Sequence, residues 1–146
     1  MALVRRGTYS YGDSQLDIRE ELLRYSAANS YLVHHFSDAV CICGGTLFRL
    51  VLDDAEGAAL RTCVTCGTEH AIGDSDEYMQ DAQMQECACP CESEQFQITA
   101  GVSLYEGSED VRWFYIGCRC QRCGLTAVYG DWKNEFFSYR ELLSRV

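Results

Sequence analysis

Residues 41–50 read CICGGTLFRL, and the same pattern returns at residues 89–98 as CPCESEQFQI. The two segments share a Cys-x-Cys pair and, five positions after the second cysteine, a phenylalanine, Phe48 or Phe96. Agreement in one ungapped register indicates an internal repeat.

The second half of each copy agrees as well. Residues 63–67 read CVTCG and residues 120–124 read CQRCG. Both are followed at the same offset by a Gly-Asp pair, Gly73-Asp74 or Gly130-Asp131. The second copy has a longer spacer between its cysteine pairs, which we interpret as a longer β-hairpin around residues 106–110.

Ten cysteines in 146 residues call for a chemical role. Two short cysteine loops that meet can place four sulfurs around one ion at roughly 2.3 Å. Glycine directly after a cysteine loop lets main-chain amides turn toward the sulfurs. The pattern therefore predicts two Zn²⁺ per chain, with iron as the alternative because four sulfurs suit both metals. The predicted ligands are Cys41, Cys43, Cys63 and Cys66 for one ion, and Cys89, Cys91, Cys120 and Cys123 for the other.

The CxxCG segments resemble those of zinc-ribbon proteins, which carry rubredoxin-like knuckles. The resemblance covers residues 39–74 and 87–131, and it departs from the family where the first knuckle of each copy is CxC instead of CxxC. It implies a structural metal and no particular activity, because this fold group serves many functions.

We expect a small metal-bound α+β fold, in which two tandem four-cysteine zinc ribbons are flanked by an N-terminal helix and a short C-terminal helix. Apolar spacing predicts the first helix at residues 13–28, capped by Asp13 or Ser14, and the second at about residues 138–145. Strands are expected at residues 46–52, 96–104 and 111–117. The expected divisions are an N-terminal helical segment (1–36), a first ribbon (37–80) and a second ribbon with the C-terminal helix (81–146), packed as one unit.

Cys87 and Cys118 are left over, each two residues before a predicted ligand. Three interpretations remain open for them. They are two buried thiols, a disulfide or redox pair, or replacements for Cys91 and Cys120 as ligands.

The formal net charge is −10, and two zinc ions on eight thiolates would lower it to −14. So acidic a chain is repelled by phosphate backbones and by anionic membranes, and it favours a protein partner with a basic face. Residues 112–133 are the exception, because they combine four basic residues with aromatic ones. The candidate partner-binding residues are Arg112, Arg119, Arg122, Trp132 and Lys133.

Four sulfurs leave no open metal position, which argues against catalysis. The sequence therefore favours a non-enzymatic protein-interaction module, such as an adaptor or a bacterial toxin-neutralising (immunity) protein. One alternative is a nucleic-acid-associated ribbon that binds through the Arg/aromatic edge, and another is a thiol redox protein that uses Cys87 and Cys118. Since no apolar leader or membrane-length apolar run is visible, we expect a cytoplasmic protein.

Overall fold

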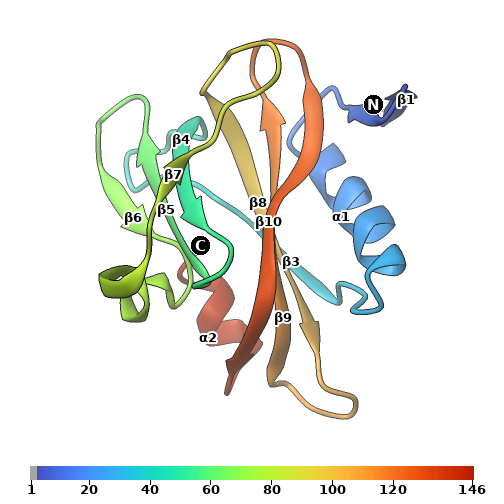
Figure 1. Ribbon diagram of the computed structural model, residues 1–146, viewed down its shortest axis with the longest axis vertical. Coiled ribbons are helices and arrows are strands. Elements are labelled where there is room, and N and C mark those ends of the chain that lie inside the picture. Colours follow the sequence, from blue (N-terminus) through green and yellow to red (C-terminus); the bar gives the residue numbers. More distant parts are fainter. Residues whose placement is uncertain (1–2) are drawn as a thin grey trace.

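The structure, a computed structural model, describes residues 3–146. Within this range one antiparallel sheet runs in the order β1-β2-β10-β9-β8-β4-β5-β6, while β3 pairs with β8 and β7 pairs with β4 (Figure 1). The strands are β1 (Val4–Arg6), β2 (Tyr9–Tyr11), β3 (His35–Asp38), β4 (Phe48–Asp53), β5 (Ala58–Cys63), β6 (Glu69–Ala71), β7 (Gln85–Glu86), β8 (Phe96–Leu104), β9 (Val111–Cys120) and β10 (Leu125–Phe136). The helices are α1 (Asp17–Ala28) and α2 (Tyr139–Leu143), with 3₁₀ turns η1 (Ser75–Glu77) and η2 (Met79–Asp81).

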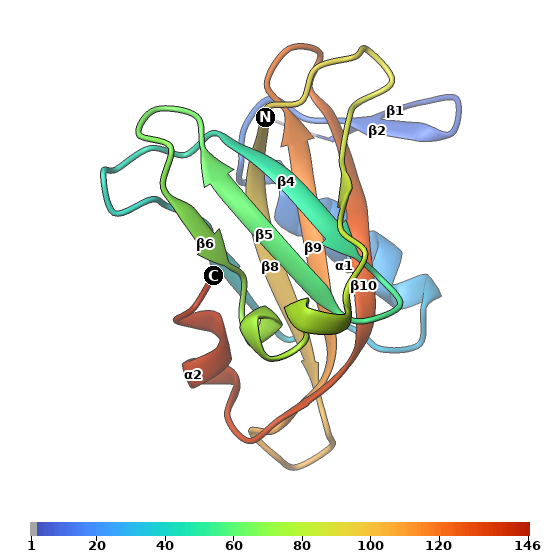
Figure 2. The ribbon, with the colours of Figure 1, turned by 60° about the vertical axis from the view of Figure 1, so that its left-hand side comes forward.

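The long strands β8, β9 and β10 form the middle layer of the molecule. Helix α1 covers one face, where Ile18 and Leu22 pack with Tyr115. Strands β4 and β5 lie over the opposite face and share the larger core with it (Figure 2). Because both faces are covered, β8 is buried along nearly its whole length, although its sequence alternates apolar residues with polar residues or glycine.

The two halves of the repeat meet at their equivalent phenylalanines. Phe48 of β4 is paired with Phe96 of β8, and no other pair joins these two strands. Phe48 is also paired with Cys63 of β5, just as Phe96 is paired with Cys120 of β9. Strand β4 leaves β8 after this single pair, so the β4–β5–β6 half can fold back over the central strands.

The expected fold class is wrong. The described chain is β-rich, with ten strands in one sheet and only two helices, one of them five residues long. It is therefore not an α+β pair of ribbons flanked by helices. The sequence interpretation ended the second copy near its Gly-Asp pair, whereas β10 continues to Phe136 and also pairs with β2. Main-chain pairing between the copies then merges them into one sheet.

The expected first helix also needs correction. Helix α1 begins at Asp17, and no side chain caps it. Instead the Asp17 carboxylate accepts hydrogen bonds from the main-chain N–H groups of Asp13 and Ser14, so the preceding turn is tied to the helix. The expected strands, the 106–110 hairpin turn and a C-terminal helix are present, with α2 shorter than expected.

Gly117 lets α1 approach the central strands closely. A Cβ at this position would lie 2.5 Å from Ile18 Cγ2, and one at Gly101 would lie 3.0 Å from Val33 Cγ1. We expect Gly117→Ala to lower the free energy of unfolding by about 1–3 kcal/mol, because the packed helix must shift. Gly101→Ala is the matched variant with the smaller expected loss. Urea denaturation measures both, and an unchanged midpoint for Gly117→Ala would contradict this packing.

Candidate metal centres

The first cysteine cluster joins the loop before β4 to the turn after β5. The sulfurs of Cys41 and Cys66 lie 3.5 Å apart, and those of Cys43 and Cys63 lie 3.7 Å apart. All four sulfurs lie within 4.8 Å of one another. Tetrahedral bonds of 2.3 Å place sulfurs about 3.8 Å apart, so the cluster can hold one metal ion.

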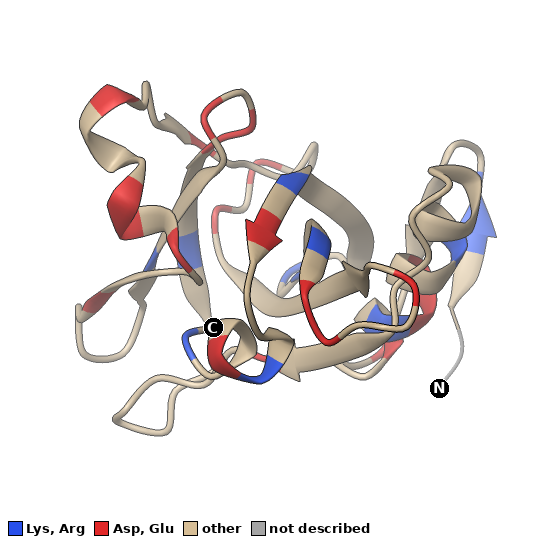
Figure 3. Cartoon of the chain, turned by 90° about the horizontal axis from the view of Figure 1, so that it is seen from below, with Lys and Arg blue, Asp and Glu red and all other residues tan. Residues whose placement is uncertain are grey.

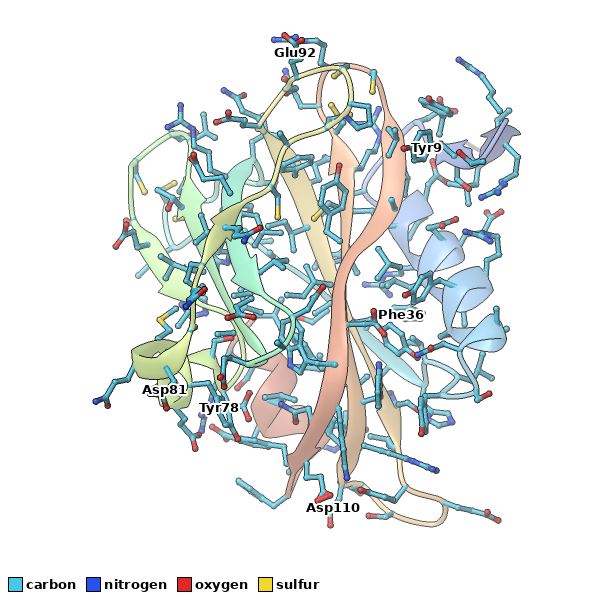
Figure 4. All side chains as sticks on the ribbon, viewed as in Figure 1. Tyr9, Phe36, Tyr78, Asp81, Glu92 and Asp110 are labelled. Atoms are coloured by element: carbon cyan, nitrogen blue, oxygen red, sulfur yellow. The ribbon has the colours of Figure 1, made fainter. Side chains whose placement is uncertain are left out.

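The second cluster repeats this arrangement around β8 and β9. Its sulfur distances are 3.5 Å for Cys89–Cys123 and 3.6 Å for Cys91–Cys120, and all four again lie within 4.8 Å. Figure 4 places the labelled Glu92, which follows Cys91, at the upper end of the molecule. The prediction of two four-cysteine groups at metal-binding distance is confirmed.

The same turn builds the first knuckle of both clusters. The Cys41 N–H donates to the Gly45 carbonyl and the Cys89 N–H donates to the Ser93 carbonyl, each at 2.8 Å. The residue after the second cysteine has a positive φ in both, 92° at Gly44 and 77° at Glu92. Glycine adopts this conformation freely, whereas Glu92 adopts it at a steric cost. The CxC spacing thus gives one defined turn in both copies.

Main-chain amides stabilise thiolate charge in the second knuckles. At Cys63, N–H groups of Cys66 and Thr65 lower the thiol pKa. Hydrogen bonds from the hydroxyl and the main chain of Thr68 lower the pKa of Cys66 to about 6. At Cys120, burial raises the thiol pKa, but the N–H groups of Cys123 and Arg122 outweigh it and leave the pKa at about 7. Thiolates are the forms that bind metals, so these shifts favour binding through Cys63, Cys66 and Cys120, whereas burial raises the pKa of Cys123.

Arg61 adds a buried positive charge to the first cluster. Its side chain is 5% exposed, its Nε donates to the Val146 main-chain oxygen at 2.8 Å, and its guanidinium lies 4.5 Å from the Phe48 ring centre. Burial lowers the pKa of Arg61, while the charges of Cys41 and Cys63 oppose that shift. Sequence reasoning missed this role, although a signal existed: Arg61 is the only Lys or Arg between positions 53 and 111.

Arg61→Met is expected to weaken Zn²⁺ binding at the first cluster by about 10–100-fold, because groups that support metal ligands typically have effects of this size. Competition with a chromophoric chelator measures the affinity. Arg49→Met removes an exposed arginine from neighbouring β4 and serves as the control. Equal affinities in both variants would show that Arg61 does not support the thiolates.

Cys87 and Cys118 lie beside the second cluster, and both are free thiols. Cys118 is fully buried, Cys87 is partly buried, and the charge of Cys87 adds to burial in raising the pKa of Cys118. Burial, followed by the charge of Asp54, raises the pKa of Cys87 to about 11. In the first copy these positions hold Ala39 and Arg61. The four sulfurs that converge in the second cluster are those of the predicted ligands, not of these two cysteines.

Slow thiol alkylation of Cys87 is expected in the metal-loaded protein. A pKa of about 11 favours the protonated thiol at neutral pH, and the reactive thiolate grows only as pH rises toward that value. At pH 8 we expect Cys87 to react about 100-fold more slowly than a thiol of ordinary pKa, with Cys118 unlabelled until unfolding. Mass spectrometry after iodoacetamide treatment measures this, with Cys87→Ser as control. Rapid labelling would instead indicate an activated thiol.

The candidate partner-binding residues do not share one surface. Arg112 and Arg119 stand seven residues apart on β9, which is roughly 23 Å of extended strand. Arg112 stacks over Tyr31, whereas Arg119 Nε donates to the Gly12 carbonyl at 2.7 Å. Both guanidinium groups are therefore already engaged within the chain.

The other three candidates are divided in the same way. Trp132 is 7% exposed and packs against Phe114 in the core. The Lys133 side chain is exposed and lies 3.8 Å from Glu135, while an Arg122 nitrogen donates to the Cys91 carbonyl at 3.2 Å. The five candidates are thus divided: Arg112 and Lys133 lie near one end of β9, Arg119 and Arg122 lie near its other end, and Trp132 lies in the core.

No family model, curated protein or solved structure matches this chain. The resemblance to zinc ribbons therefore identifies no family, and what stands is two four-cysteine clusters at metal-binding distance. None of the described helices is both long and apolar enough to cross a membrane.

Proposed function

We propose that this chain is a non-enzymatic protein-interaction module whose fold is held by two structural zinc ions. The observation that carries the proposal is the pair of four-sulfur clusters, in each of which all four sulfurs lie within 4.8 Å of one another. Four thiolates fill every position of a tetrahedral zinc ion and leave none for a substrate or a reactive water. The eight cluster cysteines are the proposed ligands, in the two groups that the repeat defines.

Burial supports a structural role for the metals. In each cluster two sulfur-bearing residues are buried in the core, Cys41 and Cys63 in the first and Cys89 and Cys120 in the second. A metal at either position would tie the loop before one strand to the turn after the next. Zinc is favoured over iron because it has no redox chemistry and occupies closed four-cysteine sites as a structural ion.

Charge supports a protein partner with a basic face. The net charge of −10 would become −14 with both zinc ions bound. Figure 3 shows Asp and Glu spread over loops, strands and helical turns of the molecule, and the sequence has 22 of them against 12 Lys and Arg. Complementary charge accelerates association and selects partners, as an adaptor or a toxin-neutralising protein requires.

Two measurements test this function. Metal analysis of the purified protein is expected to give two zinc per chain, and one, none or iron would contradict the metal assignment. Zinc-loaded protein immobilised on a resin and exposed to lysate of its host is expected to retain a basic protein. Added salt should release that protein, because exposed charges are screened over about 10 Å at 0.1 M salt. A lack of any salt-sensitive protein partner would contradict the interaction role.

A further inference from the structure

The first cysteine cluster carries apolar side chains on its outside. Ile42, between two proposed ligands, is 96% exposed. Val40 is 52% exposed in the same knuckle, and Val64 is 40% exposed in the opposite knuckle. We call these three residues, together with the exposed Cys43 and Cys66, the first tip. These exposed apolar side chains come from both knuckles of one cluster, in contrast to exposed residues scattered over a surface.

The repeat supplies an internal control for this surface. At the equivalent positions the second copy has Ala88, Pro90 and Gln121. Both copies nevertheless form the same knuckle turn, with matching main-chain hydrogen bonds at Cys41 and Cys89. The turn and the four-sulfur geometry therefore do not require apolar residues at Val40, Ile42 and Val64. These side chains are exposed, so packing in the core does not require them either.

Charge distinguishes the two tips further. Residues 39–48 and 62–68 contain no Asp, Glu, Lys or Arg, although the whole chain has a net charge of −10. The knuckles of the second copy include Glu92 and Arg122. A zinc ion with four thiolates carries a charge of −2, and Arg61 beside it is buried. The exposed Arg49 lies at the edge of the tip, beside Val64 and Cys63, while the Cys43 and Cys66 side of the tip combines an apolar surface with negative sulfurs. Exposed Cys43 and Cys66 sulfurs can accept hydrogen bonds from outside.

We propose that the first tip is the docking surface of this module, and that its partner is a protein with an apolar socket for Ile42 rimmed by Lys or Arg. The rim would face the Cys43 and Cys66 thiolates, whose charge it complements. A second copy of this chain is a poor occupant, because it would bring two negative clusters together in two acidic molecules. This inference rests on the proposed function and adds the surface and the partner's chemistry to it.

The experiment exchanges the tips. Ile42→Pro/Val64→Gln places the residues of the second copy on the first, in a turn that already accommodates them, so folding and zinc content should be retained. Pro90→Ala/Gln121→Ala is the matched control at the second tip.

Random peptides displayed on phage are selected against zinc-loaded wild-type protein, and the enriched peptides are synthesised. We expect an apolar centre flanked by Lys or Arg, and affinity lowered about 10-fold or more by the exchange, as for a central interface residue. The control should bind as wild type.

Enriched peptides that bind the exchanged variant as tightly as wild type, or a selection that enriches none, would overturn the first tip as a docking surface. Binding of wild type to phosphatidylcholine vesicles that the exchange abolishes would overturn the protein partner in favour of lipid. A basic lysate protein retained equally by wild type and the exchanged variant would overturn this inference alone and leave the proposed function standing. Absence of any salt-sensitive partner would contradict the proposed function itself.

Discussion

Cys120→Ser is expected to abolish cooperative folding, whereas Cys63→Ser, its repeat equivalent, should lose one zinc and retain a folded centre. A four-cysteine zinc site contributes about 10–16 kcal/mol near neutral pH, which equals or exceeds the typical stability of a domain, about 5–15 kcal/mol. Cys120 is fully buried at the end of β9, next to β8. Loss of the second site therefore releases the strands that support both faces of the molecule.

The first site holds a more separable part of the structure. Strands β4, β5 and β6 pair with the central strands only at Phe48 and Phe96, and they contact the rest chiefly through side chains. Near-ultraviolet circular dichroism and thermal denaturation distinguish the two variants, with zinc content measured in each. A sharp transition near the wild-type midpoint for Cys120→Ser would contradict a structural role for the second site.

Phe48→Ala is expected to cost about 3–5 kcal/mol, as a fully buried phenylalanine typically does. Phe48 joins the two repeat halves, and its ring also lies under the buried Arg61 guanidinium. At this chain length the loss corresponds to a midpoint about 10–20 °C lower. Differential scanning calorimetry of the zinc-loaded protein measures it.

Phe137→Ala is the control, because that ring is 70% exposed. Its midpoint should stay within a few degrees of wild type. A comparably small effect for Phe48→Ala would show that contacts other than the Phe48–Phe96 junction hold the two repeat halves together.

Local chemistry was readable from the sequence wherever it depends on spacing along the chain. The two groups of four cysteines come together as the repeat predicts, because each knuckle is a short turn whose geometry its own residues set. Strand β8 matches the expected range, since its apolar residues recur at every second position from Phe96 to Leu104. The apolar spacing of the first helix grouped Leu16, Leu22, Leu23 and Ala27 on one face, with Ile18 beside them. Only Ile18 and Leu22 of these are buried, while Leu16 and Leu23 are 67% and 42% exposed, because the packing of α1 on Gly117 selects a different face.

Functional residues distant in sequence were not predictable in the same way. Arg61 and Val146 lie 85 positions apart, and only the return of the chain end beside β5 brings them together. The five basic and aromatic candidates looked like one edge because they are close in sequence. On a strand, however, neighbouring residues point to opposite faces, and the seven-residue separation from Arg112 to Arg119 spans most of the length of β9.

From the sequence alone came the repeat, the two four-cysteine groups and the two leftover thiols, because these features depend on residue type and short spacing. The tertiary structure decided that the halves form one ten-stranded sheet, that Arg61 lies beside the first cluster and that Ile42 faces outward. These features arise from main-chain pairing between distant strands and from which faces become covered. Neither is specified by a pattern within one segment, since pairing partners are chosen by the packing of the whole chain.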